Sequence, residues 1–197
     1  MMEHTARGGA RRDASKDTLI VVDFQNVYLP GYDWSCPSMP EAMKNTMKIL
    51  DAPNAPDFIM TKYIAPANPS GRWRQYNQTY QAVNQDAFLN EIPADLIPYA
   101  AKTSVIEKST YSAMKSKQVL SALNGKTAVV LTGVAAECCI LATMMDAIDM
   151  GYEIIYLYDC IAGQTPELES EIQKLAETFT PIHTSVMDSG EYLASIS

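Results

Sequence analysis

The chain has 197 residues, enough for one sizeable α/β domain, and its 47 % hydrophobic and 19 % charged residues are typical of a folded protein. Its 15 Lys and Arg against 23 Asp and Glu give a formal net charge of −8. This balance argues against nucleic acid or an anionic membrane as the partner, because binding to either needs a surplus of basic residues.

Residues 1–17 mix basic and acidic side chains and contain no continuous apolar run. A secretion signal requires such a run, and no segment approaches the roughly 20 apolar residues of a membrane span. We therefore predict a disordered or extended tail over residues 1–17 and a single domain over residues 18–197. The four cysteines then predict reduced thiols in a cytoplasmic protein rather than a disulfide framework.

From residue 18 onward, short β-branched runs alternate with longer segments of helical period. Strands are predicted over residues 18–23, 57–61, 104–108, 127–132, 154–159 and 182–186. Helices are predicted over residues 40–50, 114–123 and 138–150, after the N-cap pair Thr165 and Pro166, and after the capping box of Asp188 and Glu191. Residues 64–100 are rich in proline and aromatic residues and predict a long irregular excursion. The alternation predicts a three-layer α/β/α fold with a doubly wound, mostly parallel six-stranded sheet.

Of two motifs typical of nucleotide binding, one is incomplete in this sequence and the other is absent. The triplet at residues 125–127 (GKT) resembles the end of a phosphate-binding loop, but position 120 is Leu, where that motif needs Gly. No glycine-rich dinucleotide motif follows the first strand, where residues 23–26 read DFQN. There is also no zinc-type spacing of cysteines. We therefore expect no cofactor and no metal.

Chemistry-bearing residues stand at three strand ends that a parallel sheet would bring to one edge. Asp23 ends the first strand, Lys108 ends the third, and the pair Cys138 and Cys139 opens the helix after the fourth. A helix N-terminus and a nearby ammonium both favour a thiolate, and a carboxylate can carry the thiol proton to a leaving group. This pattern predicts a nucleophile, a cation and a base, and the spacing alone leaves open which cysteine is the nucleophile.

Three ordered blocks resemble the isochorismatase-like cysteine hydrolases. Residues 19–26 (LIVVDFQN) are similar to the opening motif of that family, in which the Asp of D-x-Q is catalytic. Residues 108–113 (KSTYSA) resemble its central K-x-x-Y-S segment. Residues 133–143 (GVAAECCILAT), followed by Ala147 and by Gly-Tyr at residues 151–152, are similar to its nucleophile motif. The third block is the most specific.

The resemblance implies a role for each residue of the motifs. The nucleophile follows the motif glycine by six positions and is Cys139, whereas Cys138 takes a position that varies in the family. Asp23 is the general acid and base, and Lys108 gives electrostatic support. The resemblance also implies a cis peptide between Val134 and Ala135, an oxyanion hole formed by the backbone amides of Ala135 and Cys139, a thioester intermediate, and assembly as a homodimer or homotetramer.

The positions of the histidines and the presence of the cysteine indicate which branch of the family the chain resembles. Nicotinamide-hydrolysing members carry histidine metal ligands after the second strand, and residues 61–80 contain no His; His183 lies far along the chain. Isochorismatases proper cleave a vinyl ether and need no cysteine. The resemblance therefore favours a metal-free amidohydrolase acting on a small amide, carbamoyl or ureido compound. The alternatives are an isochorismatase-type or nicotinamidase-type hydrolase, a catalytically silent binding member of the fold, and a redox role for the adjacent cysteines.

The substrate-binding residues are expected in the loop after Asp23 and in the excursion. We predict that Tyr28, Arg72, Trp73 and Tyr111 bind substrate, with Arg72 as a carboxylate clamp and Trp73 as an aromatic wall. Further pocket candidates in the same segments are Trp34, Arg74 and Tyr76. Trp73 and its neighbours would alternatively pack a subunit interface.

Overall fold

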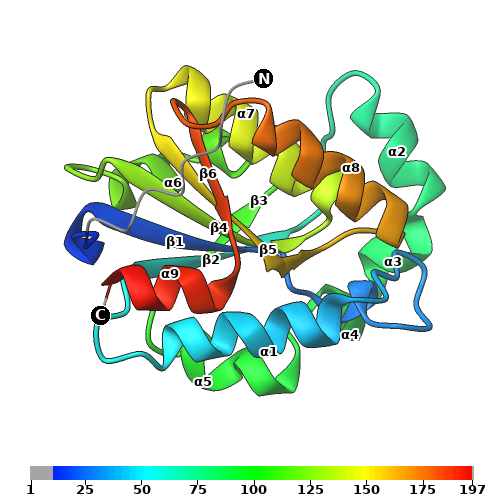
Figure 1. Cartoon of the computed structure of the whole chain (residues 1–197). Helices are drawn as coiled ribbons and strands as arrows, with labels where there is room; N and C mark the ends of the chain where they lie inside the picture. Colours follow the sequence, from blue (N-terminus) through cyan, green and yellow to red (C-terminus); the bar gives the residue numbers. More distant parts are fainter. Residues whose placement is uncertain (1–10, 197) are drawn as a thin grey trace.

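The computed structural model describes residues 11–196, and it contains the predicted parallel sheet. The strands are β1 (Asp17–Val22), β2 (Asp57–Tyr63), β3 (Val105–Lys108), β4 (Ala128–Val134), β5 (Glu153–Ala162) and β6 (Thr184–Met187). They run parallel in the order β3-β2-β1-β4-β5-β6 (Figure 1). The chain builds outward from β1 to β3 and then returns to β4, so the strand order reverses between β1 and β4. Ligands of such sheets bind at this switch point, beyond the carboxyl ends of the strands.

Helices cover both faces of the sheet, as the predicted three-layer fold requires (Figure 1). One face carries α1 (Met39–Leu50) and α9 (Ser189–Ile196). The other carries α6 (Lys117–Ala122), α7 (Leu141–Asp149) and α8 (Pro166–Glu177). Side chains of β1 alternate between the two hydrophobic clusters, because successive strand residues point to opposite faces. None of the helices within residues 11–196 is long and apolar enough to cross a bilayer.

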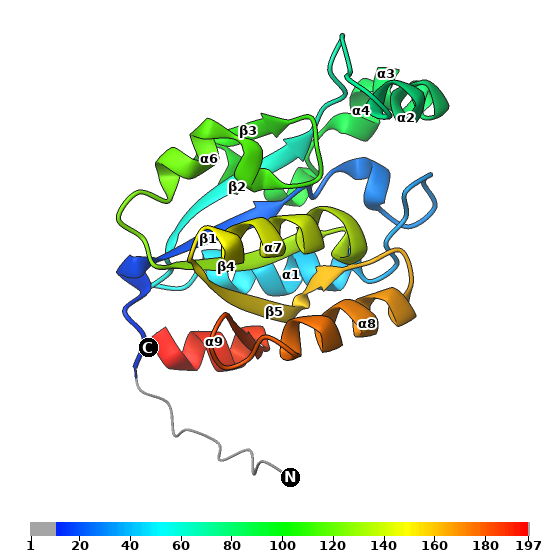
Figure 2. The same ribbon diagram turned by 90° about the horizontal axis from the view of Figure 1, so that it is seen from above.

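The excursion after β2 is more regular than predicted. It forms the short helices α2 (Trp73–Thr79), α3 (Gln81–Gln85), α4 (Ala87–Asn90) and α5 (Ile97–Ala100). Figure 2 shows α2, α3 and α4 together beyond the carboxyl ends of β1 and β2. Trp73, Tyr76 and Tyr80 recur at helical spacing. Trp73 packs against Tyr76, Tyr76 against Tyr80, and Tyr80 against Trp34.

Single-turn segments complete the fold. The 3₁₀ turns are Ala14–Lys16, Asn26–Tyr28, Ala94–Leu96 and Ala113–Lys115, and a π-helical turn spans Ala136–Ile140. The tail predicted over residues 1–17 lies partly outside the described residues, since residues 1–10 are not described. In the described part, the first 3₁₀ turn leads directly into β1, which begins one residue earlier than predicted.

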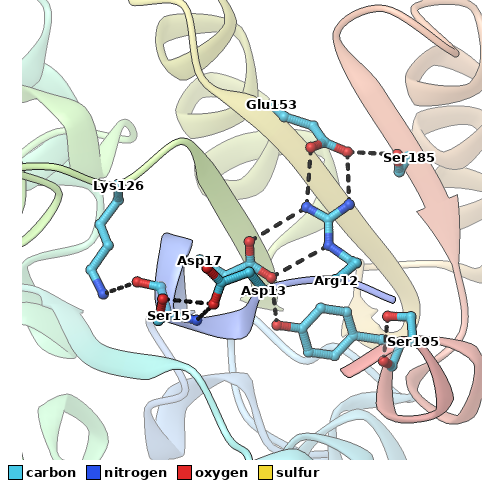
Figure 3. Close-up of polar contacts among 9 residues, drawn as sticks. Arg12, Asp13, Ser15, Asp17, Lys126, Glu153, Ser185 and Ser195 are labelled. Atoms are coloured by element: carbon cyan, nitrogen blue, oxygen red, sulfur yellow. Dashed lines mark hydrogen bonds and ion pairs between the residues drawn. The ribbon is translucent and has the colours of Figure 1, made fainter. Parts of the chain in front are cut away.

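Arg12 attaches this N-terminal segment to the body of the fold (Figure 3). Its guanidinium donates two hydrogen bonds to the Glu153 carboxylate, at 3.1 and 3.0 Å, and lies 3.4 Å from the carboxylate of Asp17. Tyr192 Oη donates to the same Asp17 carboxylate at 2.9 Å. The network therefore joins the start of β1 to β5 and α9, at the sheet edge opposite to the carboxyl ends of the strands.

Gly133 is required where β4 passes the end of β1. It pairs with Val22 and has a φ of +121°, and a Cβ built on it would lie 2.0 Å from the Val22 carbonyl oxygen. We predict that Gly133→Ala lowers the free energy of unfolding by about 3 kcal/mol or more, because backbone strain and a backbone clash add together. Urea unfolding measures the loss. Gly125→Ala is the control: it shares a positive φ but meets no atom within 4 Å, so a similar loss in both variants would contradict the clash.

Candidate active site

The three predicted catalytic side chains come together at the switch point. Asp23 follows β1, Lys108 ends β3, and Cys139 lies in the π-helical turn after β4. The Lys108 ammonium is 2.6 Å from Asp23 Oδ2 and donates to Cys139 Sγ at 3.3 Å. All three residues are buried, with at most 6 % of any of them exposed. The ammonium therefore bridges the carboxylate and the thiol in a site shielded from water.

Backbone and side-chain bonds hold this group in place. Asp23 has a φ of +51°, its N–H donates to the Thr61 carbonyl at 3.1 Å, and Thr61 Oγ1 donates to Asp23 Oδ1 at 2.7 Å. The Lys108 ammonium also donates to the Thr110 carbonyl at 2.9 Å and lies 5.9 Å from the ring centre of Tyr63. Sequence reasoning assigned no role to Thr61; its only signal was its place at the end of the strand predicted over residues 57–61, whereas β2 continues to Tyr63.

Burial sets the protonation of the thiol. Burial raises the pKa of Cys139 well above its usual range, the neighbouring Asp23 carboxylate raises it further, and Lys108 only partly opposes them. For Lys108, burial lowers the pKa, but the negative charge of Asp23 and the contact with Cys139 outweigh it, so the pKa is raised. These directions favour an uncharged Cys139 thiol and a charged Lys108 ammonium. Burial thus opposes the effect of the nearby ammonium, which by itself favours a thiolate.

Alkylation measures this protonation state. We predict that the iodoacetamide reactivity of Cys139 rises at a higher pH than that of free cysteine, whose pKa is about 8.5, because the site favours the uncharged thiol. Mass spectrometry of the peptide that contains Cys139 follows the rate across pH. In Asp23→Asn the profile shifts toward lower pH, because the negative charge that disfavours the thiolate is removed. A wild-type profile that coincides with free cysteine would contradict this assignment.

A small cavity of about 150 Å³ opens onto Cys139. Its lining residues are Tyr28, Trp34, Tyr76, Tyr80, Tyr111, Ala135, Cys138, Cys139 and Gln164. Tyr28 and Tyr111 thus lie where substrate binding was predicted. Sequence reasoning missed Tyr80 and Gln164; Tyr80 had a weak signal in its helical spacing from Trp73 and Tyr76, and Gln164 had none.

The structure separates the other two predicted binding residues from the cavity. Arg72 is exposed and does not line it, so the predicted carboxylate clamp is absent there. Trp73 lies one layer behind the wall, with its ring 4.9 Å from that of Tyr111 and 5.2 Å from that of Tyr76. It is half-buried and supports the wall through these contacts.

The backbone before Cys139 has an unusual geometry. The peptide bond between Val134 and Ala135 is cis. The carbonyl of Ala135 accepts hydrogen bonds from the amides of Cys138 and Ile140, at 3.0 and 3.2 Å, and Ala135 itself lines the cavity. These two hydrogen bonds connect the π-helical turn to Ala135, which directly follows β4. Cys139 lines the cavity.

His183, the histidine within residues 11–196, lies away from this site. His183 is exposed and immediately precedes β6, so it lies at the amino end of the sheet, away from Cys139. Within residues 11–196, no group of three or more His, Cys, Asp or Glu side chains is placed to hold a metal ion.

Comparison with known proteins places the chain in a family. A family model described as the isochorismatase domain matches residues 17–185. This chain belongs to the isochorismatase family. The match confirms the predicted family, and the sheet order described above confirms the predicted fold class.

Individual relatives of this isochorismatase-family chain are distant in sequence. An N-carbamoylsarcosine amidase from an Arthrobacter species is 26 % identical over 177 residues, covering 83 % of this chain and 66 % of that protein, slightly less than two thirds of its length. A cysteine hydrolase from Pseudomonas syringae pv. phaseolicola 1448A shares the fold with a TM-score of 0.80 and 19 % identity, over 98 % of each chain. An N-carbamoylsarcosine amidase from Thermoplasma acidophilum shares it with a TM-score of 0.68 and 22 % identity, over 88 % of this chain and 96 % of the other.

Proposed function

We propose that the chain is a cysteine-dependent amidohydrolase that cleaves the C–N bond of a small amide, carbamoyl or ureido compound. The observation that carries the proposal is the Lys108 ammonium within 2.6 Å of Asp23 and 3.3 Å of Cys139. As a proton passes between carboxylate and thiol, the negative charge moves from one to the other. Lys108 can stabilise the negative charge on either the Asp23 carboxylate or the Cys139 sulfur without moving. A thiol that is neutral before the reaction needs this stabilisation when it loses its proton.

The proposed reaction has two stages, formation and hydrolysis of a thioester. Asp23 takes the proton of the Cys139 thiol as the sulfur forms a bond to the amide carbon, and the carbonyl electron pair moves to the oxygen. The tetrahedral species collapses, the C–N bond breaks, and Asp23 gives its proton to the departing nitrogen. A water molecule then loses a proton to Asp23 and attacks the thioester carbon. The C–S bond breaks, and the thiolate takes the proton back.

The oxyanion of each tetrahedral species needs hydrogen-bond donors aimed at it. We assign this role to the backbone amides of Ala135 and Cys139. Two facts support the assignment: both residues line the cavity, and the Ala135 carbonyl is turned into the helical turn, toward the amides of Cys138 and Ile140. No side chain need supply the donors.

Similarity to an N-carbamoylsarcosine amidase supports amide chemistry over cleavage of a vinyl ether. A screen for ammonia release over small carboxamides and ureido compounds, with Cys139→Ala as control, tests the proposal. Release by the wild type alone is the expected result. Release at equal rates in both proteins, or from no compound, would refute it.

The assembly and cellular site stay predictions. The family resemblance predicts a homodimer or homotetramer, and the reduced cysteines predict a cytoplasmic protein. Light scattering on the purified full chain measures the assembly, and a monomer at micromolar concentration would contradict it.

A further inference from the structure

The walls of the cavity beside Cys139 are aromatic and carry no positive charge. Trp34 and Tyr80 have ring centres 5.4 Å apart, Tyr76 and Tyr80 4.8 Å, and Tyr28 and Trp34 5.6 Å, so the rings form a continuous wall. Among residues 11–196, no Arg, Lys or His side chain lines the cavity. The nearest ammonium, that of Lys108, is already engaged by Asp23, Cys139 and the Thr110 carbonyl.

The Glu137 side chain does not line the cavity but contacts Gln164, which does, and within residues 11–196 it forms no ion pair. Its Oε1 accepts a hydrogen bond at 3.2 Å from the backbone N–H of Gln164, which lines the cavity. Its Oε2 is buried and has no hydrogen-bond partner in the described part of the chain, and no Lys or Arg there forms an ion pair with it. An unpartnered buried carboxylate oxygen is costly, and a positive charge bound nearby would lower that cost.

Building on the proposed amidase function, we infer that the pocket selects its substrate by charge and takes an amide whose far end is an alkylammonium cation. The faces of aromatic rings attract such a cation, and Glu137 reinforces the attraction. A neutral end of the same shape keeps only the apolar contacts. A carboxylate at that end would lose its water and find no cationic partner among the described lining residues, so it would bind worst. Ureido acids with a free carboxylate are therefore poor substrates.

Three small amides that differ in charge test the inference. They are 2-(trimethylammonio)acetamide, its neutral isostere 3,3-dimethylbutanamide, and the anion malonamate, compared at equal ionic strength. Binding is measured on the full-length Cys139→Ala protein by tryptophan fluorescence, because Trp34 lines the cavity and Trp73 contacts its wall. We expect the cation to bind about 5- to 30-fold more tightly than the isostere, and the anion more weakly than both. Any other order would overturn the inference.

Matched variants in that background separate charge from shape. Glu137→Gln removes the charge and keeps the volume, and Tyr80→Leu removes one ring; each is expected to move the cation-to-isostere affinity ratio toward one. Glu171→Gln removes an exposed carboxylate on α8 and is expected to leave the ratio unchanged. An equal fall of the ratio in Glu137→Gln and Glu171→Gln would show that overall charge, not this site, selects the cation.

Measuring both binding and turnover distinguishes failure of the charge-selection inference from failure of the amidase proposal. If the cation binds best but the wild type releases ammonia from no amide, the charge selection stands and the amidase proposal fails. If the wild type hydrolyses amides but malonamate is bound or cleaved best, the amidase proposal stands and the charge selection fails.

Discussion

Cys139→Ala is expected to reduce ammonia release by at least about 10⁴-fold, because the proposed mechanism needs its sulfur to form the covalent bond to the amide carbon. Losses of this size are typical when the nucleophile of a covalent mechanism is removed. The fold is expected to persist, since the change removes only a small buried sulfur. Steady-state kinetics measures the loss, and circular dichroism with urea unfolding checks the fold.

Two further cysteine variants sharpen this result. Cys160→Ala removes an equally buried thiol from β5, away from the cavity, and turnover within a few-fold of the wild type is expected. Mass spectrometry of acid-quenched wild-type reactions should find the acyl group on the peptide that contains the two adjacent cysteines. Turnover that is lost in Cys138→Ala but kept in Cys139→Ala would reverse the assignment of the nucleophile.

Lys108→Met is expected to lower the free energy of unfolding by about 3–5 kcal/mol and to abolish turnover. The Lys108 and Asp23 side chains are only 3 % and 0 % exposed, so removal of the ammonium leaves a buried carboxylate without its counter-charge. The double variant Asp23→Asn/Lys108→Met removes both charges and should recover much of the stability but none of the activity. Urea unfolding and the ammonia assay measure the two effects.

Lys62→Met provides the matched control for that loss. Lys62 ends in ion pairs with Glu91 and Glu107, whose side chains are 58 % and 62 % exposed. Exposed pairs contribute little, so the expected loss is within about 1 kcal/mol. If Lys108→Met costs no more than Lys62→Met, the buried pair is not the stabilising feature that its geometry implies.

Much of the site was predictable because its residues belong to local motifs at strand ends. Asp23, Lys108 and Cys139 could be assigned from three short blocks, since a parallel sheet brings its carboxyl ends to one edge. Arg72 could not be placed correctly, because it adjoins Trp73 in the sequence but is an exposed residue immediately before α2. Gln164 could not be found at all, because only the path of the chain after β5 brings it to the cavity.

By itself, the sequence determined the alternation of strands and helices, the family and the three candidate catalytic side chains, because each depends on local periodicity or on a short motif. Only the tertiary structure decided the protonation of the thiol and the charge of the pocket. Both depend on burial and on contacts between distant segments: the pKa of Cys139 is raised because the thiol is buried and lies beside Asp23. The pocket is aromatic and has no Arg, Lys or His among its described lining residues because Tyr28, Trp34 and Tyr80 meet there.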